Sequence, residues 1–465
     1  MPSTVRVNAW TGEAGAPTGS FHPQFRKWAL GEAGRPVPDL LGIPAEIDLK
    51  NWRDPRVGWG VVLPFRSGLS SADLAAAVDG PQALRDLVAQ RSAEIGKPVP
   101  VLRFQPELGE LRLRRPSAEK DRDVNVTARM GMEVDQLPRY LLLVGSPAEI
   151  PWRLQYVLAS QHAVGRLDLD EEGLSRYLKA LAGGFTGASA DPHKALVWSV
   201  VHGPDDITQT LRAQVGRKVH QALAGGIGAG ARFLDGKADE TAATRGALAA
   251  ALAAEKPALV VTTSHGQTGP LSDPAAMAAA LGLPVDQSFK TLSPDDLLAA
   301  WQPDGAIWYA HACCSAGSAG ESYFAGLFEP GSDLEKLLSA VAALGSLTAP
   351  LPRCLLGCDK PLRAFIGHVE PTFDWTLRDP ETGQPLSSRL CDALFPELYQ
   401  LKPVGLAFDG WQRQVDAFHR AAEALHIRFD HGESIGEKDL FPRLAARDVE
   451  STVILGDPTA VLPAL

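Results

Sequence analysis

Ala258-Leu-Val-Val-Thr-Thr-Ser-His-Gly266 and Ala306-Ile-Trp-Tyr-Ala-His-Ala-Cys-Cys314 follow one pattern, an apolar run that ends in polar, chemically active side chains. Short apolar runs of this kind are typical of strands buried in a parallel sheet. Parallel strands end along one edge of a sheet, and open α/β sheets carry their chemistry at that edge. The pattern therefore predicts that the imidazole of His265 and the thiol of Cys313 lie side by side there.

The rest of the chain alternates apolar strand patterns with amphipathic helix patterns. Strands are expected at 57–64, 99–104, 140–144, 194–201, 231–234, 364–368 and 452–455. Helices are expected at 71–78, 82–95, 171–182, 205–223, 241–254, 333–344 and 411–425. The charged run 112–123 is expected to be an exposed loop, and residues 1–55 an irregular lead-in. This alternation predicts an α/β fold with a mainly parallel sheet and helices on both faces.

The length of the chain predicts more than one subdomain. A chain of 465 residues exceeds the size of a single typical core. The small and polar stretch 183–191 is the best candidate boundary between two α/β subdomains. We expect 1–130 to be a structural or regulatory N-terminal region that offers a surface to a regulatory partner. Residues 131–190 then complete the first α/β subdomain, and 191–465 form the catalytic subdomain.

Charge and cysteine usage narrow the classes of function. A net charge of −10 argues against nucleic acid as the main partner. The sequence has no apolar run long enough to span a membrane, and its first residues lack the apolar segment of a signal peptide. The chain has only five cysteines, and two of them are adjacent. This usage argues against a fold held together by disulfides and favours a protein of the reducing cytoplasm.

Four further segments carry a resemblance to a known family. They are Arg139-Tyr-Leu-Leu-Leu-Val-Gly145, 147–151, Val164-Gly-Arg-Leu167 and Val453-Ile-Leu-Gly-Asp-Pro458. Together with the His-Gly and Ala-Cys motifs, which are 48 residues apart, they resemble the caspase-like superfamily of cysteine proteases. The spacing is close to the roughly 50 residues between the His and Cys of caspases. The order of the segments favours the gingipain-like branch or the related CHAT-domain branch, over roughly residues 135–463.

The resemblance implies a cytoplasmic, bacterial cysteine endopeptidase that needs no cofactor and cleaves a restricted protein or peptide substrate. Cys313 would be the nucleophile and His265 the general acid and base, with a thiol pKa drawn toward neutral by the imidazole. The backbone N–H groups of Gly266 and Cys313 would form the oxyanion hole. Cys314 is the rival nucleophile, and the sequence does not nominate a third catalytic residue.

The residues of a substrate pocket are less clearly marked. The candidates are acids and one aromatic residue near the two proposed walls of the pocket, namely Asp168, Glu370, Asp374 and Trp375. A desolvated carboxylate would favour cleavage after Arg or Lys. Arg166 and Arg378 lie close to these acids in sequence and would reverse that preference if they neutralised them.

Other readings stay open from the sequence. A catalytically inactive caspase-like scaffold and a non-proteolytic cysteine hydrolase are both compatible with the motifs. No metal site is expected, because the cysteines at 354 and 358 are not spaced as in CxxC pairs and adjacent cysteines rarely bind one tetrahedral ion. The glycine cluster 225–230 lacks the Gly-Lys-Ser/Thr of a phosphate-binding loop.

Overall fold

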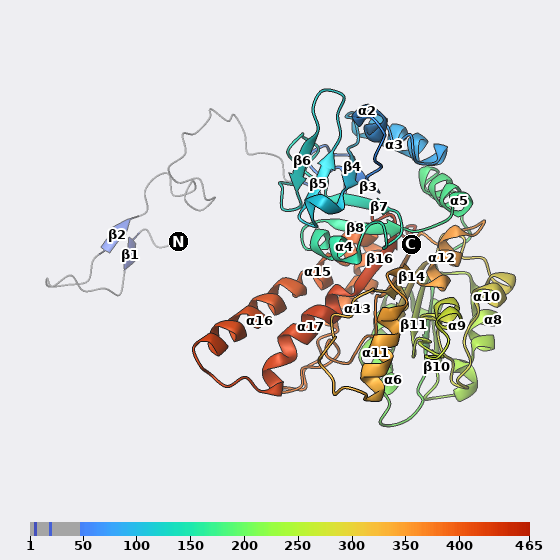
Figure 1. Cartoon of the computed structure of the whole chain (residues 1–465). Coiled ribbons are helices and arrows are strands. Elements are labelled where there is room, and N and C mark those ends of the chain that lie inside the picture. Colours follow the sequence, from blue (N-terminus) through green and yellow to red (C-terminus); the bar gives the residue numbers. More distant parts are fainter. Residues whose placement is uncertain (1–3, 7–17, 21–46) are drawn as a thin grey trace. The chain divides into compact units, whose positions relative to one another are not determined.

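The computed structural model describes residues 4–6, 18–20 and 47–465, which belong to two compact units, Met1–Ile47 and Asp48–Leu465. In the first unit, β1 (Thr4–Arg6) pairs antiparallel with β2 (Thr18–Ser20) (Figure 1). The irregular lead-in expected for residues 1–55 otherwise falls mostly outside the described residues. Residues 47–55 contain turns without a helix or strand.

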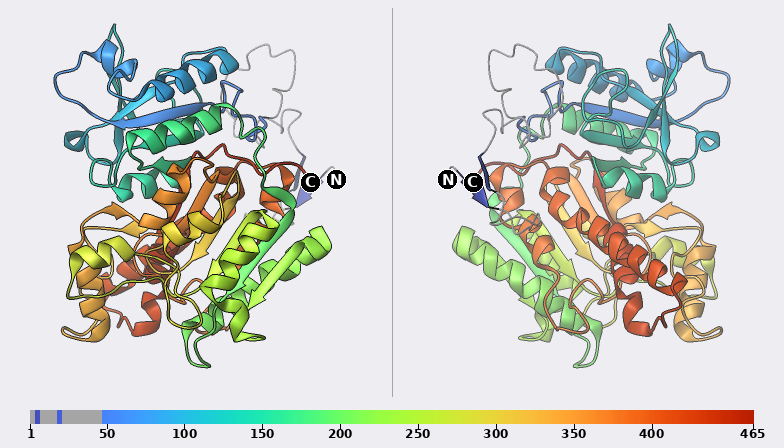
Figure 2. Two further views of the ribbon diagram at one scale, coloured as in Figure 1. Left: turned by 90° about the vertical axis from the view of Figure 1, so that its right-hand side faces the viewer. Right: turned by 90° about the vertical axis from the view of Figure 1, so that its left-hand side faces the viewer.

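The second unit is built on one twelve-stranded sheet. Its strands lie in the order β10 (Ala231–Asp235), β9 (Asp191–Ser199), β11 (Pro257–Thr263), β12 (Ile307–His311), β15 (Ala364–His368), β16 (Thr452–Gly456), β8 (Ala163–Leu167), β7 (Tyr140–Val144), β3 (Trp59–Pro64), β4 (Val101–Phe104), β5 (Arg112–Arg115) and β6 (Arg122–Asn125). Most neighbours are parallel, and helices lie on both faces of the sheet (Figure 2). The mainly parallel α/β fold expected from the sequence is confirmed.

One antiparallel pair divides this sheet into two parallel blocks. The strands from β10 to β15 run in one direction, and those from β16 to β4 run in the opposite direction, because β15 and β16 pair antiparallel. Parallel strands share a carboxyl edge, so the carboxyl edges of the two blocks lie on opposite sides of the sheet.

The helices connect these strands. The α-helices are α2 (Ser71–Ala75), α3 (Gln82–Ile95), α4 (Trp152–Ala159), α5 (Glu171–Ala182), α6 (Ile207–Leu211), α7 (Arg217–Ile227), α8 (Arg245–Glu255), α9 (Pro274–Ala280), α10 (Pro294–Ala300), α11 (Asp333–Ala343), α12 (Pro350–Gly357), α13 (Ser388–Leu394), α14 (Val404–Ala407), α15 (Asp409–Gln412), α16 (Gln414–Asp430) and α17 (Phe441–Glu450). The two-residue strands β13 (Gly317–Ser318) and β14 (Leu347–Thr348) form a separate ladder.

The expectation of an exposed loop at 112–123 is wrong in its outer parts. Both ends of the run are strands, β5 and β6, which pair antiparallel at the edge of the sheet. Arg114 on β5 forms an ion pair with Asp123 on β6, with 2.9 Å between Nε and Oδ1. Cross-strand charge pairing of this kind lets a charged sequence form an edge ladder.

The boundaries expected at residues 130 and 190 stay predictions. Strands from both sides of each position belong to the same twelve-stranded sheet, within one compact unit. In the part of the chain that the structure describes, no helix combines the length and the apolar character needed to cross a bilayer.

The central strands of the first parallel block, β11 and β12, are buried in the core. Leu259, Val260 and Val261 on β11 and Trp308 and Tyr309 on β12 are all fully buried. Strands buried on both faces are typical of parallel sheets. The ends of β11 and β12, where the chemically active residues follow, are therefore anchored in the core.

Candidate functional site

Three neighbouring strands of the first block bring the candidate residues to one edge. Thr263, the last residue of β11, lies opposite Ser199 at the end of β9 and His311 at the end of β12. The loop after β9 carries His202 and Asp206, while His265 and Cys313 each follow two residues after the end of their strand. The backbones of the His-Gly and Ala-Cys segments are neighbours, and the side-by-side placement of the imidazole and the thiol stays a prediction.

The backbone of Gly266 lies directly against that of Cys313. A Cβ at Gly266 would come within 1.9 Å of the carbonyl oxygen of Cys313, so no side chain fits there. In the described part of the chain, neither the N–H of Gly266 nor that of Cys313 donates to a backbone carbonyl. Two adjacent backbone N–H groups that are not engaged by carbonyls are the kind of donors that form an oxyanion hole.

The two adjacent cysteines have different surroundings. Cys313 is half-buried, whereas Cys314 is fully buried against Met277, Leu281 and Val341. Cys314 also has a positive φ of 55°, which turns the chain between the two residues. Of the two cysteines, Cys313 is therefore the more exposed to solvent.

The surroundings of the Cys313 thiol favour its neutral form. Burial raises its pKa to about 11, and the hydrogen bond from Sγ to the carbonyl oxygen of Thr372, at 3.6 Å, only partly offsets that effect. The lowered pKa expected from the sequence is therefore not found. A neutral thiol needs a base to remove its proton at the moment of attack.

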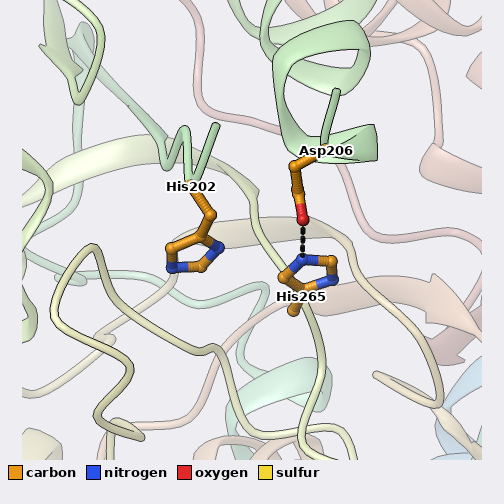
Figure 3. Close-up of side chains that lie close together, drawn as sticks. All are labelled: His202, Asp206 and His265. Carbon is orange, nitrogen blue, oxygen red and sulfur yellow. Dashed lines mark hydrogen bonds and ion pairs between the residues drawn. The ribbon is translucent and has the colours of Figure 1, made fainter. Parts of the chain in front are cut away.

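His265 is oriented by a carboxylate that the sequence did not nominate. Its Nε2 donates to Oδ2 of Asp206 at 2.9 Å (Figure 3). Asp206 caps α6, and its Oδ1 accepts from the backbone N–H of Thr208 at 2.9 Å. Burial raises the pKa of Asp206, but the hydrogen bonds from Thr208 and His265 outweigh it and leave the pKa lowered.

This bond fixes the tautomer of His265. With its proton on Nε2, the imidazole keeps the lone pair on Nδ1, where it can accept a proton. In the sequence, Asp206 reads only as the cap of the helix that follows it. Asp206 lies in the loop after β9, and β9 pairs with β11. This position was the signal in the sequence that could have marked it as a third site residue.

Three of the four pocket candidates lie on the segment that contacts the cysteine loop. The carbonyl of Glu370 accepts from the N–H of Cys314 at 2.8 Å, and the carbonyl of Thr372 accepts from the Cys313 thiol. Trp375 stacks on Phe373 with 4.1 Å between ring centroids, and Asp374 is exposed. Glu370 is only 2 % exposed, so its carboxyl group is not an open pocket wall.

Asp168 does not join this group. It follows β8, which runs parallel to β16, whereas β15 runs antiparallel to β16. The registers place Arg166 level with Phe365 near the start of β15, while Cys313 follows the end of the neighbouring β12. The reversal at β15 and β16, which the sequence did not reveal, therefore puts Asp168 toward the opposite edge of the sheet.

Arg166 does not neutralise acids of the proposed pocket. Its side chain is fully buried in the second block, where Nε donates to Oε1 of Gln155 at 2.9 Å. The guanidinium also donates to the carbonyl of Ile150 at 2.7 Å and packs over the ring of Trp152. Arg166 is therefore a structural residue that fastens α4 to β8.

No protein-family model, curated protein or solved structure matches the chain. The resemblance to caspase-like proteases consequently stays a hypothesis from sequence motifs. What the structure adds is the arrangement of His265, Gly266 and Cys313 at one edge, with Asp206 behind the imidazole.

Proposed function

We propose that the chain is a cysteine endopeptidase with Cys313 as nucleophile, His265 as general acid and base, and Asp206 as the residue that orients His265. The observation that carries the proposal is the close approach of Gly266 to Cys313 after the ends of adjacent strands, where, among the described residues, neither N–H donates to a backbone carbonyl. A thiol, an oriented imidazole and paired backbone donors are the parts that acyl transfer through a cysteine requires.

The proposed reaction is an acyl transfer in two steps. Nδ1 of His265 takes the proton of the Cys313 thiol as Sγ attacks the carbonyl carbon of the scissile peptide bond. The negative charge that develops on the carbonyl oxygen is stabilised by the N–H groups of Gly266 and Cys313. His265 then gives its proton to the leaving amine, and a thioester remains on Cys313. Water hydrolyses the thioester, which releases the acid and restores the thiol.

A neutral Cys313 thiol is compatible with an enzyme whose nucleophile reacts only when substrate is bound. A pKa of about 11 keeps Cys313 neutral near pH 7, so proton transfer to His265 must accompany attack. All five cysteines are unpaired, which supports the proposed reducing cytoplasm. The preference for a basic residue before the scissile bond stays a prediction, now based on Glu370 and Asp374 without Asp168.

A peptide library made from a digested proteome tests the proposal. We expect the full chain to produce new peptide termini, Cys313→Ala to produce none, and Cys314→Ala, the matched control, to retain cleavage. Cleavage that survives in Cys313→Ala overturns the assignment of the nucleophile. Absence of cleavage by the unmodified chain overturns the peptidase and favours the inactive scaffold or the non-proteolytic hydrolase.

A further inference from the structure

The side chain of His265 and two side chains beside it converge on one point. The ligand-type atoms of His202, Asp206 and His265 all lie within 4.8 Å of one another (Figure 3). The two imidazole rings are stacked, with 5.3 Å between centroids and an angle of 5° between planes. Each of the three residues is partly exposed to solvent.

The Nδ1 atom of His202 lacks a hydrogen-bonding partner. Its Nε2 donates to the carbonyl oxygen of Asp286 at 2.9 Å, because a carbonyl can only accept. The proton is therefore on Nε2, and Nδ1 carries a lone pair. In the described part of the chain, this Nδ1 is buried without a partner, an arrangement that costs free energy unless something binds there.

The carbonyl that fixes His202 is itself held in place. The carboxylate of Asp286 accepts from the backbone N–H groups of Arg245, Ser288 and Lys290 at 2.8–2.9 Å. The ring of Phe289 stacks on His202 with 4.1 Å between centroids and covers it from one side. Histidines that bind metals are held in the same way, with the second ring N–H donating to a carbonyl or carboxylate.

We propose that His202 Nδ1, Asp206 Oδ2 and His265 Nε2 bind one divalent transition-metal ion, with Zn²⁺ as the ion that best suits the donors. Two imidazoles and a carboxylate with one open position form a common zinc ligand set. Bonds of about 2.0–2.2 Å place tetrahedral ligand atoms about 3.4 Å apart. Starting from separations of up to 4.8 Å, the side chains need to close by at most about 1.4 Å.

The expectation of no metal site from the sequence rested on the spacing of the cysteines. The three proposed ligands, His202, Asp206 and His265, come instead from two loops that are far apart in the sequence. Asp206 and His265 are 59 positions apart. Only the parallel pairing of β9 with β11 brings the loops together.

Binding of the ion has a consequence that rests on the proposed function. The metal replaces the proton on Nε2 of His265, so the neutral ring then carries its proton on Nδ1. That nitrogen can no longer accept the proton of Cys313. We therefore expect Zn²⁺ to inhibit peptide cleavage. Its binding does not involve the thiol of Cys313.

Metal titration of the full chain, first freed of metal with a chelator, tests the site. Co²⁺ is followed by its visible absorption, and Zn²⁺ by competition with a chromophoric chelator. We expect one equivalent to bind in the unmodified chain and in Cys313→Ala. His202→Ala should weaken binding at least tenfold, while His431→Ala, which removes an exposed histidine elsewhere, should bind like the unmodified chain.

The outcomes separate the site from the peptidase. No stoichiometric binding by the unmodified chain, or equal affinity in a folded His202→Ala, overturns the site. If circular dichroism finds that variant unfolded, Asp206→Asn takes its place with the same expected weakening. Binding of one equivalent, together with no peptide cleavage by the metal-free chain, leaves the site standing and overturns the proposed function. Cleavage by the metal-free chain, together with no metal binding, overturns the site and leaves the proposed function standing.

Discussion

Glu370 provides a prediction that can be worked through from the structure. The side chain is 2 % exposed, Oε2 accepts from the N–H of Tyr323 at 3.3 Å, and Oε1 has no partner among the described residues. Burial raises the pKa of the carboxyl group from 4.5 to about 7, against smaller lowering effects from Tyr323, Ser322 and Arg447. The folded protein therefore holds a proton on Glu370 that the unfolded chain releases.

The sign and size of the effect follow from linkage. Well below pH 4.5 the carboxyl group of Glu370 is neutral in both the folded and the unfolded state, so its titration does not change the free energy of unfolding. From pH 4.5 to 7 the folded state binds more protons than the unfolded state, so its stability falls as pH rises. A pKa difference of about 2.5 corresponds to about 3 kcal/mol. Glu370→Gln, which stays neutral, should therefore be more stable than the unmodified chain by up to about 3 kcal/mol at pH 8, and this advantage should fall toward zero as the pH drops below 4.5.

Urea unfolding of both proteins at several pH values measures this difference. Comparing the two chains at each pH cancels the titration of all other groups. Glu381→Gln, at an exposed position, is the matched control and should give a difference near zero throughout. A difference that does not change with pH, or a Glu370→Gln chain that is less stable at pH 8, would refute a buried and neutral Glu370.

Three further predictions concern the site. Alkylation of Cys313 by iodoacetamide should accelerate about tenfold per pH unit between pH 7 and 10, because its pKa is about 11 and only the thiolate reacts; a rate that is flat over this range would indicate a preformed thiolate. Asp206→Asn, assayed with a chelator present, should slow peptide cleavage roughly 10²-fold, since the correct tautomer of the base is lost; an unchanged rate would remove Asp206 from the site. Gly266→Ala should abolish cleavage and lower stability by about 1–3 kcal/mol, because its Cβ would lie 1.9 Å from the carbonyl oxygen of Cys313. Gly246→Ala, with nothing within 4 Å of its Cβ, is the control and should do neither.

The local elements of the fold were predictable where the pattern is simple. The strands β7 and β15 and the helices α3 and α5 have the bounds expected from apolar runs and from glycine stops. The strands β5 and β6 were missed because their sequences are rich in charge, and cross-strand pairing rather than hydrophobicity supports them. Short helices such as α12, which starts at Pro350, offer too few turns to display a period.

The direction of strands was not predictable from local sequence. Val453-Ile-Leu455 reads as a strand whichever way it runs, yet its antiparallel pairing with β15 decides that Asp168 and Cys313 belong to opposite edges. Long-range pairing also hid Asp206, whose local role as a helix cap accounts fully for an aspartate at that position. The His265 and Cys313 motifs were visible because each directly follows a buried strand.

A thioester on Cys313 is the most direct test of the proposed mechanism. A peptide found to be cleaved in the library would be mixed with the full chain, quenched in acid within one turnover, and the protein digested and analysed by tandem mass spectrometry. The account predicts that the acyl part of the peptide is attached to Cys313 and that the adduct disappears with time. Cleavage without an adduct, or an adduct on Cys314, would contradict it.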